Sequence, residues 1–220
     1  MIVEGFTNYI PALNIKLVDI ADVKTGYSQV AKAELAYESE EDSSGTTRAV
    51  GLRSITNDGS IDLSRLDRVY TPQSEGWLKK VAGSTVQAGD LIVAARGSSG
   101  KAGLVGPVPS EPLLCTNNVL LVRPNTAIAD ARYLQAFIQN LYSDPTQEIL
   151  RRGMLGQWSI TRTDLEQLEI ELPPIAEQKR ISAAFSAMHD ARRAAQAVSD
   201  HYGLLLENLS SQYFRSKPRT

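Results

Sequence analysis

The sequence is poor in the residues on which most hydrolases and metalloproteins depend. It has 220 residues but one cysteine, Cys115, so an internal disulfide framework and a thiolate metal site are both excluded. Its two histidines, His189 and His201, both lie beyond residues 1–172. That long first part therefore has no Ser-His-Asp triad, Cys-His pair or histidine-rich metal site. We expect both histidines to be solvated on one helix, about 120° apart around its axis.

Long apolar runs and common cofactor motifs are also missing. No run of about 18 apolar residues could span a membrane, and the start of the chain lacks the basic residues of a signal peptide. We therefore expect a cytoplasmic protein. The Asn-Pro-Pro-Tyr motif of DNA methyltransferases, a glycine-rich cofactor loop and a nuclease-like carboxylate pair do not occur. We predict a protein that binds rather than catalyses, with no catalytic residue, no metal site and no cofactor of its own.

One loop, Gly97–Lys101, invites a nucleotide-binding interpretation. A Walker A loop needs a glycine five positions before its Gly-Lys pair and a Ser or Thr after the lysine, but Ala95 and Ala102 occupy those positions. Two interpretations stay open. The loop is a tight β-turn, or it is a turn whose N–H groups, with Arg96 and Lys101, approach a DNA phosphate or groove edge.

Charge is distributed unevenly along the chain, although the formal net charge is only −2. Residues 173–220 hold 7 Lys/Arg and 4 Asp/Glu, a net of +3, which leaves 16 and 21, a net of −5, for residues 1–172. The overall balance alone argues mildly against nucleic acid as a partner. A basic patch on one face remains compatible with these totals.

Residues 1–172 are predicted to form a β-rich domain with a few helices, an α+β fold. Alternation predicts a first strand, or a strand with a short turn, at residues 14–23. Further strands are predicted at residues 48–55, 91–95, 102–105, 113–116, 119–122 and 168–172. Helical spacing predicts a helix over residues 129–141. Asp144 as N-cap with Pro145 after it predicts a second helix over residues 144–152, and Thr163–Glu166 matches a capping box. Asn57–Ser60 predicts a turn in which Gly59 adopts positive φ.

A long helix is predicted over residues 175–213, after Pro173 and Pro174. Apolar and small residues recur there at heptad positions a and d, which is typical of a helix that packs lengthwise on another helix. This seam comprises Ile181, Ala184, Met188, Ala191, Ala195, Val198, Tyr202, Leu205 and Leu209. We place the domain boundary near Pro173, so residues 173–220 form the helix and a tail that we expect to fray.

Candidate DNA-contacting side chains lie in or next to the predicted loops. Arginine can read guanine, Asn and Gln can read adenine, and an aromatic ring can lie against sugar or base. On this basis the candidates are Tyr27, Arg48, Arg53, Arg96, Lys101, Asn117, Asn118, Arg152, Gln157, Trp158 and Arg162. Each one singly has an ordinary structural alternative. Arg65, Arg68, Lys79 and Lys80 fit a solvated face or phosphate contacts better than base recognition.

Several segments resemble one known family. Leu172–Ile181 (Leu-Pro-Pro-Ile-Ala-Glu-Gln-Lys-Arg-Ile) resembles the conserved-region signature of type I restriction–modification DNA specificity subunits. Ala88–Lys101 resembles their glycine-aspartate segment. Weaker likenesses extend over most of the chain, at residues 18–26, 117–125, 133–134 and 156–157.

The resemblance implies a target-recognition domain in residues 1–172, followed by the conserved helix of residues 173–220. In that family the unit usually occurs twice in one chain, and the two helices pack antiparallel and space two readers along double-stranded DNA. Methyltransferase subunits hold S-adenosylmethionine and carry out the chemistry. This sequence has one such unit, so it resembles a half-length subunit.

A half-length subunit needs a second helix from elsewhere. A second identical copy would address an inverted repeat with an unread gap, and a different half-subunit is the other possibility. Whether a restriction subunit also joins stays open. A rival hypothesis is a protein-interaction adaptor that uses the helix without binding DNA, and a third is a degenerate nucleotide-binding enzyme.

Overall fold

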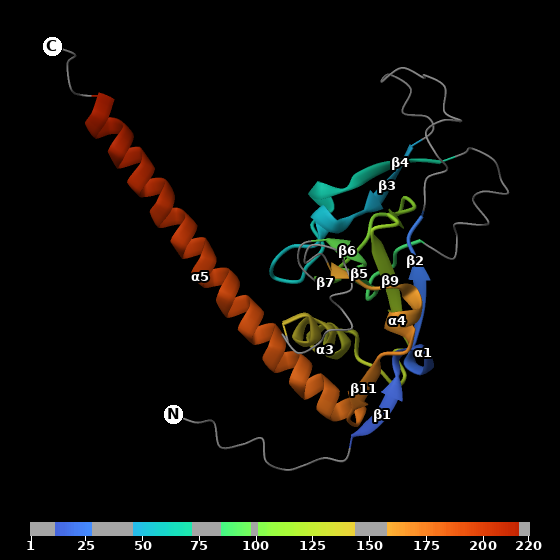
Figure 1. Ribbon diagram of the computed structural model, residues 1–220. Helices are drawn as coiled ribbons and strands as arrows, with labels where there is room; N and C mark the ends of the chain where they lie inside the picture. The colour runs from blue at the N-terminus through green and yellow to red at the C-terminus, as the bar shows by residue number, and fades with distance from the viewer. Residues whose placement is uncertain (1–11, 28–45, 72–84, 98–100, 144–157, 216–220) are drawn as a thin grey trace, which may run out of the picture. The chain divides into compact units, whose positions relative to one another are not determined.

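The structure, a computed structural model, describes residues 12–27, 46–71, 85–97, 101–143 and 158–215 (Figure 1). It divides into two compact units, Met1–Ser182 and Ala183–Thr220. The first unit combines short strands and short helices, and the second contains most of one long helix. The predicted α+β class is confirmed. Within the described ranges, no helix combines the length and apolarity needed to cross a membrane.

An antiparallel sheet of four strands, in the order β2–β9–β5–β7, lies at the centre of the first unit. The strands are β2 (Ala21–Thr25), β9 (Val119–Pro124), β5 (Leu91–Ala94) and β7 (Ala102–Leu104). Successive residues of a strand point to opposite faces. Accordingly Leu91 and Val93 of β5 join one core cluster, whereas Ile92 and Ala94 join another. The sheet thus separates two hydrophobic cores, which explains why β5 is apolar throughout.

Three smaller sheets surround this centre. In the first, β3 (Thr46–Val50) pairs antiparallel with β4 (Asp67–Tyr70) and parallel with β8 (Leu114–Cys115). In the second, β1 (Leu13–Lys16) pairs with β11 (Glu169–Leu172), which joins the two ends of the domain sequence. In the third, β6 (Arg96–Gly97) pairs with β10 (Trp158–Ser159).

Three helices cover the core cluster that contains Leu91: α1 (Leu17–Ile20), α3 (Ala131–Ser143) and α4 (Arg162–Glu166). Polar contacts also tie α3 to the central sheet. The Nε2 of Gln139 donates to the carbonyl of Ala102 in β7 at 2.8 Å, and the hydroxyl of Tyr142 donates to the carbonyl of Ala94 at 3.0 Å. Two 3₁₀ turns, η3 (Leu52–Ser54) and η4 (Leu63–Arg65), are the remaining short elements among the described residues.

Local chemistry decides the form of two of the predicted strands. Residues 14–23 follow the predicted alternative of a strand with a short turn, because Leu17 and Ile20 lie one turn apart in α1 and both enter the core. The strand predicted for residues 48–55 ends at Val50. There the hydroxyl of Ser54 accepts from the N–H of Gly51 and donates to the carbonyl of Arg65, which holds the chain in the 3₁₀ turn η3.

The capping box was predicted two residues too late. Thr161, not Thr163, caps α4: its hydroxyl accepts from the N–H of Asp164 at 3.1 Å, and the Asp164 carboxylate accepts from the N–H of Thr161 at 3.0 Å. The predicted turn at Asn57–Ser60 is confirmed, with Gly59 at φ +75°. The helix predicted for residues 144–152 lies outside the described residues.

The predicted long helix is confirmed as α5 (Ile175–Arg215), of 41 residues. Most of the seam is exposed, including Met188 at 69% and Leu209 at 62%. Ile181 differs, because it packs against the core of the first unit. The division into units accordingly falls after Ser182 rather than at Pro173.

The two histidines of α5 have different surroundings. His201 is exposed, as expected. His189 is only partly exposed, and its ring lies against that of Phe185 with centroids 4.4 Å apart. The expectation of solvated helix-surface histidines therefore holds for His201 and only in part for His189.

Candidate nucleic-acid interface

One end of the central sheet brings together candidates that lie far apart in the sequence. Because neighbouring strands run antiparallel, the last residues of β2 and β5 lie at the same end as the first residues of β9 and β7. The register confirms this, with Thr25 opposite Leu120, Ala94 opposite Val119 and Val93 opposite Ala102. The residues just beyond these pairs form what we call the sheet-end row: Tyr27, Asn117, Asn118, Arg96 and Lys101.

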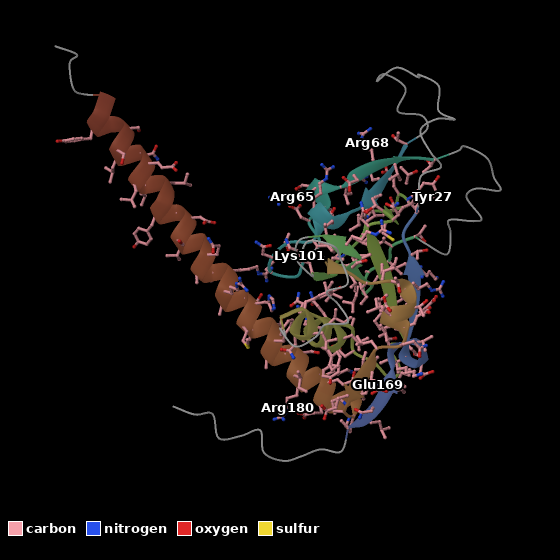
Figure 2. The ribbon with its side chains drawn as sticks, in the orientation of Figure 1. Tyr27, Arg65, Arg68, Lys101, Glu169 and Arg180 are labelled. Carbon is pink, nitrogen blue, oxygen red and sulfur yellow. The ribbon has the colours of Figure 1, made fainter. Side chains whose placement is uncertain are left out.

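Backbone hydrogen bonds continue across this row after the strands end. The N–H of Ala95 donates to the carbonyl of Asn118 at 3.0 Å, and the N–H of Ala94 donates to the carbonyl of Lys101 at 2.8 Å. The N–H of Tyr27 donates to the carbonyl of Cys115 at 2.6 Å. The backbone of the sheet-end row is therefore hydrogen-bonded between neighbouring segments, so these residues do not lie on isolated loops (Figure 2 labels Tyr27 and Lys101).

The members of the row differ in how free their side chains are. Asn117, Asn118 and Arg96 are exposed. Lys101 is partly exposed and donates to Oδ1 of Asn57 at 2.8 Å. Tyr27 is partly buried against the small cluster of Ala49, Val69 and Leu114, so it also has a packing role. The row thus presents two amides and two cations, with a tyrosine at its β2 side.

A close backbone contact fixes the position of Tyr27. A Cβ added to the preceding residue, Gly26, would lie 1.9 Å from the carbonyl oxygen of Thr116. Only glycine permits this approach, which brings the chain after β2 onto the turn before Asn117 and Asn118. Tyr27 then forms an isolated parallel bridge with Thr116.

A second basic feature lies on the sheet β4–β3–β8. The register places Arg48 of β3 directly opposite Arg68 of β4, and both are exposed. Arg48 forms an ion pair with Glu111 at 3.0 Å. Among the described residues, Arg68 has no charged or hydrogen-bonding partner. Two like charges in directly opposed positions repel one another, and a bound anion would offset that repulsion.

The remaining candidates are less closely associated with the sheet-end row. Arg53 forms an ion pair with Asp67 at 2.7 Å and donates to the carbonyl of Leu66, and Arg162 pairs with Glu166 within α4 at 2.7 Å. Trp158 reaches the row through its backbone, opposite Gly97. Its side chain, and all of Arg152 and Gln157, lie outside the described residues.

Arg65 and Arg68, for which the sequence predicts a solvated face or phosphate contacts, have different surroundings. Arg65 pairs with Asp62 at 3.2 Å. What distinguishes Arg68 is its position opposite Arg48, and this depends on the register of β3 with β4. An alternation of charged and apolar residues around position 68 predicts exposure but not which residue lies across the strand.

Comparison with known proteins identifies the family. The family described as "Type I restriction modification DNA specificity domain" matches residues 14–195. The chain belongs to this family. The resemblance read from Leu172–Ile181 and Ala88–Lys101 is thereby confirmed.

Individual relatives agree with this assignment. The putative type I restriction enzyme MjaX specificity subunit of Methanocaldococcus jannaschii is 29% identical over 132 residues, which cover 59% of this chain and 30% of the relative. Two solved structures share the fold. One comes from work on complex assembly and conformational transition of the type I R-M system, and it has a TM-score of 0.60 at 16% identity. The match covers 90% of this chain and 43% of the chain in that structure.

The other is the HsdS subunit from Thermoanaerobacter tengcongensis, with a TM-score of 0.55 at 16% identity. The match covers 84% of this chain and 38% of the HsdS chain. The chain described here therefore spans less than half the length of each of these relatives.

The far end of the central sheet of this specificity domain is held by an ion pair. Asp90, which is 1% exposed, accepts from Nε and Nη2 of Arg123, both at 2.8 Å, and from the N–H of Gln87. The hydrogen bond to Asp90 raises the pKa of Arg123. This bidentate pair lies at the opposite end from the sheet-end row and has a structural role.

Titratable groups give no indication of a metal site. Among the described residues of the specificity domain, no group of three His, Cys, Asp or Glu side chains could hold a metal ion. Burial, with a contribution from the charge of Asp90, raises the pKa of the Cys115 thiol to about 12. A thiol that keeps its proton is a poor nucleophile and a poor ligand.

Proposed function

We propose that the sheet-end row reads bases in one half of an interrupted DNA site, as the recognition part of a type I restriction–modification complex. The observation that carries this proposal is the gathering of Asn117, Asn118, Arg96 and Lys101 at one end of the central sheet. Three interstrand spacings of about 4.8 Å make the row about 14 Å long, close to the roughly 12 Å width of the major groove.

Within this proposal the side chains have different tasks. Each asparagine amide can donate to and accept from the edge of an adenine, and Arg96 can donate twice to guanine. Lys101 and the facing pair Arg48 and Arg68 contact phosphates, which supplies affinity and makes it salt-dependent. The existing ion pair of Arg48 with Glu111 is exposed, and such pairs contribute at most about 1 kcal/mol, so a phosphate can replace the carboxylate.

The exposed seam of α5 supports pairing with a second copy of the same helix. An antiparallel arrangement places a positions opposite d positions. In the register that places Ala184 opposite Leu209, Ala191 meets Tyr202 and Met188 meets Leu205. Two of these layers combine a small residue with a large one, which fills space evenly. A parallel pair would place Ala184 against Ala184 and leave a void. Size complementarity therefore favours the antiparallel homodimer.

In this arrangement the paired helices set the distance between two readers and provide a surface for methyltransferase subunits. Those subunits hold S-adenosylmethionine and transfer its methyl group, and this chain supplies the sequence address without a cofactor of its own. Two identical readers related by a two-fold axis address an inverted repeat with an unread gap. A restriction subunit is compatible with this assembly but is not required for methylation.

Methylome sequencing tests the proposal in cells that carry the intact locus or a deletion of this gene. We expect an interrupted palindromic motif whose methylation depends on the gene. A gene-dependent motif with two unlike halves would instead point to pairing with a different half-subunit. The adaptor hypothesis would be favoured, and ours overturned, if deletion of the gene removes no methylated motif and the protein does not bind random duplex at low salt.

A further inference from the structure

Gln178, near the start of α5, is a polar side chain enclosed in the first unit. It is 1% exposed, and its amide makes three hydrogen bonds, all to backbone groups. Its Oε1 accepts from the N–H of Asp130 at 2.8 Å, and its Nε2 donates to the carbonyls of Ile128 at 3.0 Å and Pro173 at 2.8 Å. An amide offers one acceptor and two donors, which matches the requirement of these three groups.

The Asp130 carboxylate connects the same region to the next turn of α5. One of its oxygens accepts from the N–H groups of Arg132 and Tyr133, which caps the start of α3. The same oxygen accepts from the hydroxyl of Ser182 at 2.5 Å. Gln178 and Ser182 are four residues apart and therefore lie on one face of α5. We call Gln178, Asp130 and Ser182 the helix joint.

An ordinary core position would be satisfied by an apolar side chain of similar volume. At position 178, methionine would leave one N–H and two carbonyls without these hydrogen bonds, and the carbonyl of Pro173 would lose its partner in a buried position, which is costly. Glutamate would direct a carboxylate oxygen at two carbonyl oxygens. The requirement for an amide thus comes from joining two segments, residues 128–130 and Pro173, to the first turn of α5.

A fixed joint matters because α5 is long. Forty-one residues extend about 60 Å, so a change of about 10° at the base would move the far end by about 10 Å, or about three base pairs. We propose that the helix joint is a positioning element that holds the direction of α5 and so restricts a two-reader assembly to one gap length. This inference rests on the proposed function of α5 as a spacer.

The test uses the complex with its methyltransferase subunit and duplexes that keep both half-sites while the gap varies by one or two base pairs. We expect wild type to methylate one gap length. In Gln178→Met, which removes all three hydrogen bonds of the amide, the preference over neighbouring gaps should fall by about tenfold or more. Ser182→Ala should show a smaller fall, and Ser182→Thr, which keeps the hydroxyl, should restore selectivity. Lys179→Ala, at an exposed neighbouring position, is the control.

A second measurement is independent of DNA. Spin labels at Glu169→Cys and Ala197→Cys, diluted with unlabelled protein, report the distribution of distances between the two units. We expect Gln178→Met to broaden this distribution while the circular dichroism spectrum stays unchanged. An unchanged distribution, or an unchanged gap profile, would overturn the role of the joint. A wild-type complex with no gapped motif would overturn the proposed function instead, and the spin-label result would still decide whether the joint is rigid.

Discussion

Arg48 and Arg68 lie directly opposite one another on β3 and β4, and both side chains are exposed. Like charges in opposed cross-strand positions destabilise a sheet, typically by about 0.2–1 kcal/mol. Arg48 has Glu111 as a counter-charge, and Arg68 has none among the described residues. A DNA phosphate bound near Arg48 and Arg68, as in the proposed function, would offset this repulsion.

Arg68→Thr should therefore have opposite effects on stability and on DNA binding. We expect the free energy of unfolding in low salt to rise by a few tenths of a kcal/mol, because the repulsion is lost. The slope of log Kd against log salt should decrease by about 0.9, the value for one phosphate contact. Urea titrations and fluorescence anisotropy measure the two quantities. Lys16→Thr, which removes a charge from β1, is the control that should leave the salt slope unchanged.

Asn118→Ala should alter specificity rather than salt dependence. The Asn118 side chain is exposed, whereas its backbone carbonyl accepts from Ala95, so the substitution leaves the sheet intact. We expect affinity for the cognate duplex to fall by about 1–3 kcal/mol and discrimination at one base pair to relax. Competition anisotropy with single-base variants measures this. An equal loss on every sequence would show that Asn118 contacts phosphate instead.

Charging the seam should separate the two copies. Met188→Glu with Leu205→Glu places carboxylates at two seam positions that are 69% and 44% exposed in the single chain. We expect light scattering to report a monomer, because burial of these charges in a helix pair is unfavourable. Leu204→Glu is a matched control, since Leu204 is also exposed but lies off the seam. If the double variant stays as dimeric as wild type, the seam is not the interface.

Cross-linking should reveal the orientation of the helix pair. In the antiparallel register proposed above, Ala184 of one copy meets Leu209 of the other, so mixed Ala184→Cys and Leu209→Cys chains should form a disulfide. A disulfide requires Cα atoms within about 7 Å, which a parallel pair cannot provide between these positions. Non-reducing electrophoresis measures the product. Efficient homodimeric cross-linking of Ala184→Cys alone would indicate a parallel pair.

Cys115 provides a probe of the core of the specificity domain. Its side chain is fully buried, and burial raises its pKa from 9.0 to about 12. Between pH 9 and pH 12 the unfolded state loses this proton while the folded state keeps it, so stability should fall by up to about 1.4 kcal/mol per pH unit. Urea midpoints between pH 8 and pH 10.5 test this, and Cys115→Ala should reduce the slope. The native thiol should also resist Ellman's reagent until urea is added.

The family assignment and the main elements could be predicted from sequence because their signals are local. The heptad pattern of residues 181–209 depends on helical geometry alone, and the apolar run at β5 marks a strand buried on both faces. The errors were local as well. The strand assigned to residues 48–55 ended early because Ser54 binds Gly51 and Arg65, and alternation alone does not predict such side-chain bonds to the backbone.

By itself, the sequence determined the class of the protein, the length of α5 and the types of side chain available for contacting DNA. Only the tertiary structure decided which of them act together. Tyr27, Arg96, Lys101 and Asn118 share one sheet end because of antiparallel pairings between distant strands, and such register is a non-local property. The structure likewise assigned Ile181 and Gln178 to the domain rather than to the free helix, because the first turns of α5 pack against a core built from distant segments.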